Sequence, residues 1–467
     1  MGIEKYGALT ILFLLPQIAI QLDFGVTATG TRVMALFQAE SKFNYRVQVF
    51  WEVMATLVVI GLLQVFLFSF FAQNLMQLLQ LEQILATQFN DVVIATSCWI
   101  FASLIGAGVS IAARAFERFK LLASIQALTV SLFWLGAWGL AIINPDIVLI
   151  LWCGVFSSVV ATILLIFNVR KTIKLPTDIL GSRALLLPSY FHFSAGTFAA
   201  QASSLLTYHA DKFLVAALIS PAAVGVYNAC ASIASKVLVI VSAIATFSFP
   251  RAVRLNSEGA LDELSDVYLR ATRLCVMTSM VIVIPLASLA EPFLQLWLKA
   301  DYKAEYAYVL ILMAAGYLFA SFSVVASNVC IGMGGARMPA LFAIIGGSTT
   351  LILCILLAPE FGLYGAVIAS VSGMSQALIF NWLVAKKLGS IQEKQMINFS
   401  LSVILFSGVT IFLLSQVMYI VTSWFVLILS GIGIILLLIP LWFLCGLTTE
   451  NERESLSSLW RKINGNN

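Results

Sequence analysis

The sequence predicts an all-α polytopic membrane protein with about thirteen transmembrane helices. Two observations support this fold class: the composition is 61% hydrophobic and only 10% charged, and the apolar residues form long uninterrupted runs. A hydrocarbon core about 30 Å thick requires a helix of roughly 20 apolar residues. Because unpaired backbone groups are too costly in lipid, only helices and closed barrels can span it. The runs are too long and too uniformly apolar for barrel strands, which have about ten residues and alternate in polarity.

Each apolar run is expected to form one helix. The first run follows Glu4 and Lys5, contains Pro16, and is too long for a cleavable signal peptide. Pro16 and Pro285 both fall inside runs, so we expect them to kink their helices. To within several residues, the runs cover 6–31, 47–71, 89–113, 119–142, 146–168, 189–219, 222–249, 266–290, 306–331, 338–357, 363–385, 397–418 and 422–446.

Lysine and arginine are sorted between alternate gaps. Most of the 26 basic residues lie in every second gap between the runs, and the opposite side holds only Lys5, Lys299 and Lys303. This is the positive-inside pattern, which places the basic gaps in the cytoplasm. The net charge of +4 therefore reflects loops beside anionic lipid and does not indicate a nucleic-acid partner. Two lysines, Lys212 and Lys236, lie inside runs, and topology does not explain them.

The basic segment 169–188 is the predicted boundary between two helical bundles. Residues 6–8 at the start of the first run are similar to residues 224–228 in the seventh run. If these runs correspond, the sixth run has no counterpart, and a first helix is missing from the N-terminal bundle. The expected parts are an N-terminal lobe of five helices, a cytoplasmic linker, a C-terminal lobe of six helices, an extra helix pair and a cytoplasmic tail, at 1–168, 169–188, 189–388, 389–446 and 447–467.

The sequence lacks the motifs of most enzymes that act at membranes. It contains no GxSxG, Walker A, HExxH or DxD motif. Its seven cysteines lie in apolar runs without a CxxC pair, and its two histidines are too few for a typical metal site. It also lacks the large outer loop of several membrane glycosyltransferases and polymerases. We therefore expect a transporter, without a cofactor or metal, rather than an enzyme.

Lys236 is the sharpest candidate for a functional residue. It falls near the middle of the run 222–249, where a charge costs about 2.5–3.5 kcal/mol and needs a partner or a wet cavity. Its neighbours Ser232, Ala234 and Ser235 are small. A lysine at this depth does not easily reach either interface, which favours a cavity. The alternative is a lysine bonded to the backbone carbonyls of a neighbouring helix.

A second polar group lies at residues 207–212, near the end of the run 189–219. Adjacent helical residues point about 100° apart, so Asp211 and Lys212 are not expected to pair with each other. Tyr208 and His209 lie on related faces, and His209 is a candidate for titration near neutral pH. The stripe favours a functional surface; the alternative is a structural ion pair with another helix.

Asp23 and Arg32 lie in the first run and its end. Asp23 either binds a coupling proton or cation, or caps a helix break, because Gly25 and Gly30 weaken the helix after it. Arg32 either binds phosphate or is simply the first basic residue of the cytoplasmic side. The residues alone leave both pairs of alternatives open.

Together these segments resemble bacterial polysaccharide flippases of the Wzx type. The resemblance rests on residues 211–215 (DKFLV), 220–227 (SPAAVGVY) and 249–251 (FPR), and it extends over nearly the whole chain. Further matches are Tyr6-Gly7 followed by 23–25 (DFG) and Arg32, then 332–334 (GMG) with Arg337, and 359–366 (PEFGLYGA). Each motif is loose, but their order and spacing together are specific.

The resemblance implies a fold, a substrate and partners. The wider superfamily includes MATE drug exporters and lipid II flippases, with two six-helix bundles and often two added helices. The implied function is to flip undecaprenyl-pyrophosphate-linked oligosaccharide, such as an O-antigen repeat unit, across the bacterial inner membrane by alternating access. Membrane lipids, a polysaccharide polymerase and a chain-length regulator are the other implied partners. The family's first helix normally precedes the Tyr6-Gly7 element, so the resemblance implies that this sequence begins just after it, either because the start codon is placed too far downstream or because the chain is a natural variant.

If the resemblance holds, the candidate residues can be given roles in substrate binding or ion coupling from the chemistry of their side chains. Cations that face a wet cavity attract a diphosphate. A MATE-like exporter of cationic drugs is an alternative, but its cavity is expected to favour carboxylates, which Lys236 argues against; a membrane polymerase or acyltransferase is a third interpretation. The substrate-binding candidates are Lys236, Lys212, Arg32, Tyr208, Tyr227 and Asn228, and the ion-coupling candidates are Asp211, Asp23 and His209.

Overall fold

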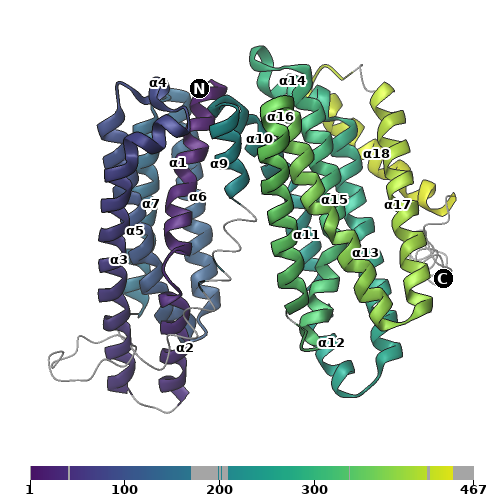
Figure 1. The fold of residues 1–467 in the computed structure, drawn as a ribbon, viewed down its shortest axis with the longest axis horizontal. Coiled ribbons are helices and arrows are strands. Elements are labelled where there is room, and N and C mark those ends of the chain that lie inside the picture. The colour runs from purple at the N-terminus through teal and green to yellow at the C-terminus, as the bar shows by residue number, and fades with distance from the viewer. Residues whose placement is uncertain are drawn as a thin grey trace. The chain divides into compact units, whose positions relative to one another are not determined.

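The computed structural model describes residues 2–39, 43–169, 198, 201, 209–335, 337–417 and 421–444. Every regular element in this part of the chain is helical, as predicted. Eleven of the described helices are long and apolar enough to cross a membrane. The chain divides into two compact units, Met1–Val226 and Tyr227–Asn467 (Figure 1). The predicted boundary at 169–188 is almost entirely outside the described residues.

The N-terminal unit is a bundle of helices, most of them long (Figure 1). Its helices are α1 (Ile3–Gln21), α2 (Val26–Ala39), α3 (Phe43–Leu78), α4 (Glu82–Leu85), α5 (Phe89–Ala115), α6 (Phe119–Ile143), α7 (Ile147–Val169), α9 (Ala210–Leu218) and the start of α10 (Pro221–Ala234). Their buried core includes Val53, Leu57, Leu104 and Ile111. Large apolar side chains such as Phe70 and Trp138 remain exposed, which suits a surface that faces lipid.

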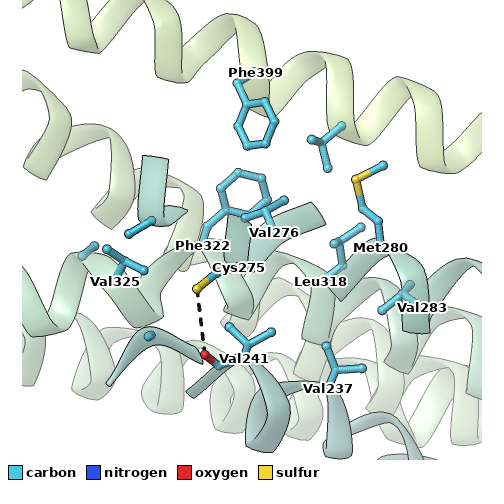
Figure 2. Close-up of a cluster of buried hydrophobic side chains, with 14 of the residues drawn as sticks. Val237, Val241, Cys275, Val276, Met280, Val283, Leu318, Phe322, Val325 and Phe399 are labelled. Carbon is cyan, nitrogen blue, oxygen red and sulfur yellow. Dashed lines mark hydrogen bonds between the residues drawn. The ribbon is translucent and has the colours of Figure 1, made fainter. Parts of the chain in front are cut away.

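The C-terminal unit continues from α10. Its helices are α11 (Lys236–Ala245), α12 (Ser248–Ser257), α13 (Leu261–Ser288), α14 (Ala290–Leu298), the 3₁₀ turn η1 (Lys299–Asp301), α15 (Ala304–Gly332), α16 (Arg337–Leu388), α17 (Ser390–Val417) and α18 (Trp424–Leu444). In Figure 2 its core brings Cys275, Phe322 and Phe399 together from α13, α15 and α17. The Cys275 thiol donates to the carbonyl oxygen of Val241 across 3.9 Å.

Buried polar contacts also join the helices of this unit. The Tyr268 hydroxyl donates to the backbone carbonyl of Asn381 across 2.9 Å and also contacts the Asn381 side chain. The hydroxyls of Ser279 and Ser321 lie 3.0 Å apart. Such contacts satisfy polar groups that lipid cannot satisfy, and small residues allow close approach between the helices.

The difference between eleven and thirteen spans has two causes. Helix α16 is one element of 52 residues, yet Gly362 inside it has φ of +58° and interrupts the helical path. It therefore contains both predicted runs 338–357 and 363–385, which confirms that they are separate. The predicted run 189–219 is mostly outside the described residues, and only α9 represents it.

One predicted run is interrupted rather than continuous. The run 6–31 breaks between α1 and α2, where Phe24 and Gly25 take φ of +56° and +75°. In the run 222–249, Ser235 lies between α10 and α11 with helical φ and ψ of −63° and −19°, so the two helices form one continuous span. The interruption of the first run falls beside Asp23, which the sequence marked as a candidate. Breaks of this kind free backbone polar groups, which is tolerated in membranes only where protein or water satisfies them.

Candidate functional site

Asp23 holds the break between α1 and α2. Its side chain is fully buried, at 0% exposure. One carboxylate oxygen accepts from the backbone N–H of Gly25 at 2.8 Å, and the other accepts from the backbone N–H of Thr27 at 2.9 Å and from the Thr27 hydroxyl. A carboxylate in this position caps the helix and interacts favourably with its positive N-terminal end. Asp23 therefore caps α2, and its role as an ion carrier stays a prediction.

Side chains from other segments complete the polar cluster at this break. The amide of Gln64 on α3 donates to the carbonyl oxygens of Ala19 and Leu22, at 3.1 and 3.0 Å. In the amide orientation that satisfies both of its ends, Gln201 donates to Asp23 Oδ1 and to the carbonyl oxygen of Gln21, each at 3.2 Å. The carbonyls at the end of α1 are therefore bonded even though the helix stops within the bundle.

His209 also lies at the break. Its Nε2 atom lies 3.4 Å from Nε2 of Gln21. Three buried atoms of the cluster lack a partner among the described residues: His209 Nδ1, Gln21 Oε1 and Gln64 Oε1. Buried polar atoms without partners are uncommon in native proteins and often mark an ordered water or an ion. The predicted ion-coupling residues Asp23 and His209 are thus brought into one polar region of the N-terminal unit.

Asp211 and Lys212 pair with each other, and the prediction that they do not is wrong. The Lys212 ammonium lies 3.5 Å from Asp211 Oδ1, with both side chains mostly buried. The same oxygen accepts from the backbone N–H of Lys212 at 2.9 Å. Asp211 and Lys212 lie in the first turn of α9. There the Asp211 carboxylate turns toward the backbone N–H of Lys212 and so comes close to the Lys212 side chain. The 100° separation expected of adjacent residues in a helix interior therefore does not keep the two side chains apart.

The remaining predicted site residues are distributed over both units. Lys236 opens α11 with its side chain exposed, and no hydrogen bond or ion pair joins it to another described residue. Arg32 is exposed on α2, Asn228 is half-buried on α10, and Tyr227 is buried. Tyr208 lies outside the described residues.

A cleft in the N-terminal unit is a site that the sequence did not reveal. It has a volume of about 570 Å³ and is formed by one face each of α1, α5, α6 and α7. This falls within the range of small-molecule sites.

Aromatic rings form one part of the wall. The rings of Phe13 and Trp99 meet edge to face at 5.4 Å, and those of Phe13 and Phe133 do so at 5.3 Å. Trp99 and Phe133 are 5.5 Å apart, which closes a three-ring cluster between α1, α5 and α6. These are the spacings that aromatic pairs prefer, and such pairs fix ring orientation. Trp134 extends the aromatic surface along α6.

Hydroxyls and amides form the other part of the wall. Trp99 Nε1 donates to the Ser158 hydroxyl at 3.0 Å, and Ser103 lies 3.4 Å from the same oxygen. The other polar groups on the wall are Gln17, Ser110, Gln126, Thr129 and Ser157, and Arg114 lies where α5 ends. The cleft can therefore offer rings, hydroxyls and amides to one ligand, with a positive charge at its basic end.

Each helix contributes to the cleft with helical spacing. On α5, Ser103, Gly106, Ala107, Ser110 and Arg114 all line it, and their positions follow one face of a helix. This stripe of small and polar residues is visible in the sequence. It does not show which other helices face it, so the cleft requires the tertiary structure.

The helices define a multi-pass membrane protein with a MATE-like fold. Residues 3–307 match the model of a family described as polysaccharide biosynthesis protein, so the chain belongs to that family. This agrees with the resemblance seen in the sequence. The fold class is also confirmed, because solved transporters share it.

Two solved structures illustrate the shared fold. The lipid II flippase MurJ in an inward closed conformation has a TM-score of 0.68 and 16% identity, over 93% of each chain. An inward-facing MATE multidrug resistance transporter has a TM-score of 0.64 and 14% identity, over 84% of this chain and 92% of that one. At such low identity these similarities show the fold alone.

A curated relative matches only part of the chain. An uncharacterised membrane protein of Methanocaldococcus jannaschii is 32% identical over 146 residues, which cover 30% of this chain and 28% of the relative. The match therefore spans less than a third of that relative's length.

Proposed function

We propose that the chain is a flippase, not an enzyme, which moves undecaprenyl-pyrophosphate-linked oligosaccharide from the cytoplasmic to the outer leaflet of the bacterial inner membrane. An O-antigen repeat unit or a related surface polysaccharide is the proposed cargo. Membership of a polysaccharide biosynthesis family and the fold shared with transporters support this role. A polymerase and a chain-length regulator would act on the product.

The observation that carries the proposal is the mixed surface of the N-terminal cleft. A saccharide and its diphosphate cannot cross hydrocarbon unaided, because their polar groups would be unsatisfied there. The cleft offers rings against which the apolar faces of sugars can pack, and hydroxyls and amides that can bond sugar hydroxyls. Arg114 at its end suits the anionic linkage. The polyprenyl chain can remain in lipid.

The predicted cations fit this role unequally. Lys236 is exposed and is the strongest candidate for attracting diphosphate. Lys212 is partly neutralised by Asp211, and Arg32 is exposed on α2 near the basic end of its unit. Tyr208, Tyr227 and Asn228 are proposed sugar contacts, although Tyr227 would have to become accessible first. Asp211, Asp23 and His209 are the proposed coupling residues.

The alternative is a MATE-like exporter of small cationic molecules. Such a site is expected to present a carboxylate to its ligand. None of the described residues that line the cleft is acidic, and its one charged residue is Arg114. The buried carboxylate of Asp23 is occupied by three donors of its own helix turn. The cleft therefore favours an anionic or neutral polar ligand over a cation.

A complementation experiment tests the proposal. The gene is deleted in its host and replaced by wild type, Trp99→Ala or Arg114→Gln. Trp138→Ala and Lys120→Gln are matched controls, because both side chains are exposed and neither lines the cleft. The deletion and the two cleft variants should accumulate lipid-linked oligosaccharide and lose surface polysaccharide, whereas the controls should not. Normal export in the deletion strain would remove the flippase function.

A further inference from the structure

A second polar pocket lies in the C-terminal unit. It has a volume of about 310 Å³ and lies between the end of α13, α14, the start of α15 and the end of α17. Its polar wall consists of Ser288, Glu291, Gln295, Tyr308, Ser415 and Gln416. In Figure 1, α14 lies at the opposite end of this unit from α12, which carries Arg251 and Arg254. By the positive-inside pattern, the pocket is on the outer side of the membrane.

Glu291 and Gln295 provide a paired acceptor and donor. They lie one turn apart on α14, and Gln295 Nε2 donates to Glu291 Oε1 at 3.2 Å. Glu291 is in the first turn of α14, where the helix dipole favours a negative charge. A carboxylate beside an amide can accept and donate at once, which suits neighbouring hydroxyls on one ligand.

Ser288 gives an independent indication of a ligand. Its side chain is only 3% exposed, and its hydroxyl oxygen has no hydrogen-bond partner among the described residues. An unsatisfied buried hydroxyl costs about 1–3 kcal/mol. Because Ser288 lines the pocket, a hydroxyl-bearing ligand there can supply the missing partner.

Aromatic and phenolic groups complete the surroundings of the pocket. Tyr308 is 58% exposed, and the centroid of its ring lies 6.4 Å from that of Tyr364. Tyr302 lies in the loop before α15, with its hydroxyl buried. Burial and, after it, the negative charge of Glu291 raise the pKa of Tyr302 above its ordinary value. The Tyr302 phenol therefore remains protonated near Glu291 at neutral pH.

The chemistry of the wall indicates the class of ligand. A bound cation requires several oxygens at about 2.3–2.6 Å around a small volume, whereas this pocket has a volume of about 310 Å³, holds one carboxylate and includes amide donors. We propose that the pocket binds the sugar hydroxyls of an oligosaccharide on the outer side of the membrane. The identity of the ligand as a saccharide rests on the proposed function. The site is distinct from the cleft, which is in the other unit.

Direct binding to the purified full-length protein in lipid nanodiscs tests this proposal. The probe is the oligosaccharide pool released by mild acid from the host's lipid-linked saccharides, and binding is measured by saturation-transfer NMR and calorimetry. Glu291→Gln and Ser288→Val should each weaken binding by about tenfold or more, since each removes or blocks a polar contact. Glu305→Gln is the matched control, because Glu305 is near the same end but does not line the pocket. It should bind like wild type.

The variants also separate this site from the cleft. Trp99→Ala alters the cleft alone, so it should retain the saccharide binding at the outer pocket that Glu291→Gln abolishes. Absence of saturable binding to the wild type, or equal binding by wild type and Glu291→Gln, would overturn the outer site. The outer saccharide site would also be overturned if the wild type binds sodium instead of sugar and Glu291→Gln loses that sodium binding. If the deletion strain exports normally while the purified protein still shows Glu291-dependent binding, the proposed transport function is wrong but the proposed binding site stands.

Discussion

The carboxylate of Asp23 accepts a hydrogen bond from the backbone N–H of Thr27 at 2.9 Å, and this contact begins α2 inside the bundle. The preceding residues turn through positive φ at Phe24 and Gly25. Because the side chain is buried, its negative charge is stabilised by local donors rather than by water. The break in the first apolar run is therefore stabilised by its own helix cap, the Asp23 carboxylate.

Two substitutions at Asp23 separate capping from ion transport. Asp23→Ala should lower the free energy of unfolding by about 1–3 kcal/mol, because it removes a cap and leaves buried donors unpaired. Asp23→Asn keeps an acceptor oxygen and should lose less stability. Thermal unfolding in detergent measures both. If Asp23→Asn is stable and transports normally, Asp23 is a cap alone; if it is stable but inactive, the carboxylate has a second role.

Gly7 and Pro221 approach each other at backbone distance within the N-terminal unit. A Cβ atom on Gly7 would lie 1.8 Å from the carbonyl oxygen of Pro221, and one on Gly225 would lie 2.8 Å from that of Ile3. Gly7→Ala should therefore push α1 from α10 and destabilise the protein by about 1–3 kcal/mol. Gly139→Ala is the control, because no atom lies within 4 Å of its Cβ position. Equal melting temperatures for the two variants would contradict the close contact.

The helices follow directly from the apolar runs, whereas their breaks depend on distant contacts. The predicted separation of 338–357 from 363–385 is confirmed by the non-helical Gly362. This break is an exception, because Pro359 and Gly362 are residues within the segment itself that favour the end of a helix. The sequence alone did not decide whether the helix breaks at Asp23. Gln64 and Gln201, which form hydrogen bonds at this break, come from other segments of the chain.

The candidate site was less accessible to sequence reasoning than the fold. Charge within an apolar run singled out Lys236 and Asp211, since charge is costly in lipid. The cleft depends instead on uncharged side chains such as Ser103, Gln126 and Ser158, which carry little signal one at a time. Only the packing of four helices shows that these stripes face each other.

The ion pair of Asp211 and Lys212 predicts coupling between the two substitutions. Lys212→Met should destabilise the protein, because it leaves a largely buried carboxylate without this cation. Asp211→Asn combined with Lys212→Met should recover part of the loss. We expect an interaction energy of about 0.5–3 kcal/mol from the double-mutant cycle, measured by thermal unfolding. Strict additivity would mean that the pair contributes nothing.

Lys236 should matter for transport and not for stability. Its side chain is exposed at the start of α11, so Lys236→Ala should change the free energy of unfolding by less than about 0.5 kcal/mol. Lipid-linked oligosaccharide should nevertheless accumulate on the cytoplasmic side. Lys236→Arg, which keeps the charge, should restore part of the export. Unchanged surface polysaccharide in Lys236→Ala would exclude this lysine from the mechanism.

Flipping by the purified protein in liposomes tests the central claim most directly. Undecaprenyl-diphosphate oligosaccharide is placed in both leaflets, and a membrane-impermeant enzyme modifies only the sugar exposed outside. Wild type and Trp138→Ala should make the inner-leaflet pool accessible, whereas Trp99→Ala should leave most of it protected. An inner pool that stays protected with folded wild-type protein, under every imposed proton and sodium gradient, would contradict the flippase account.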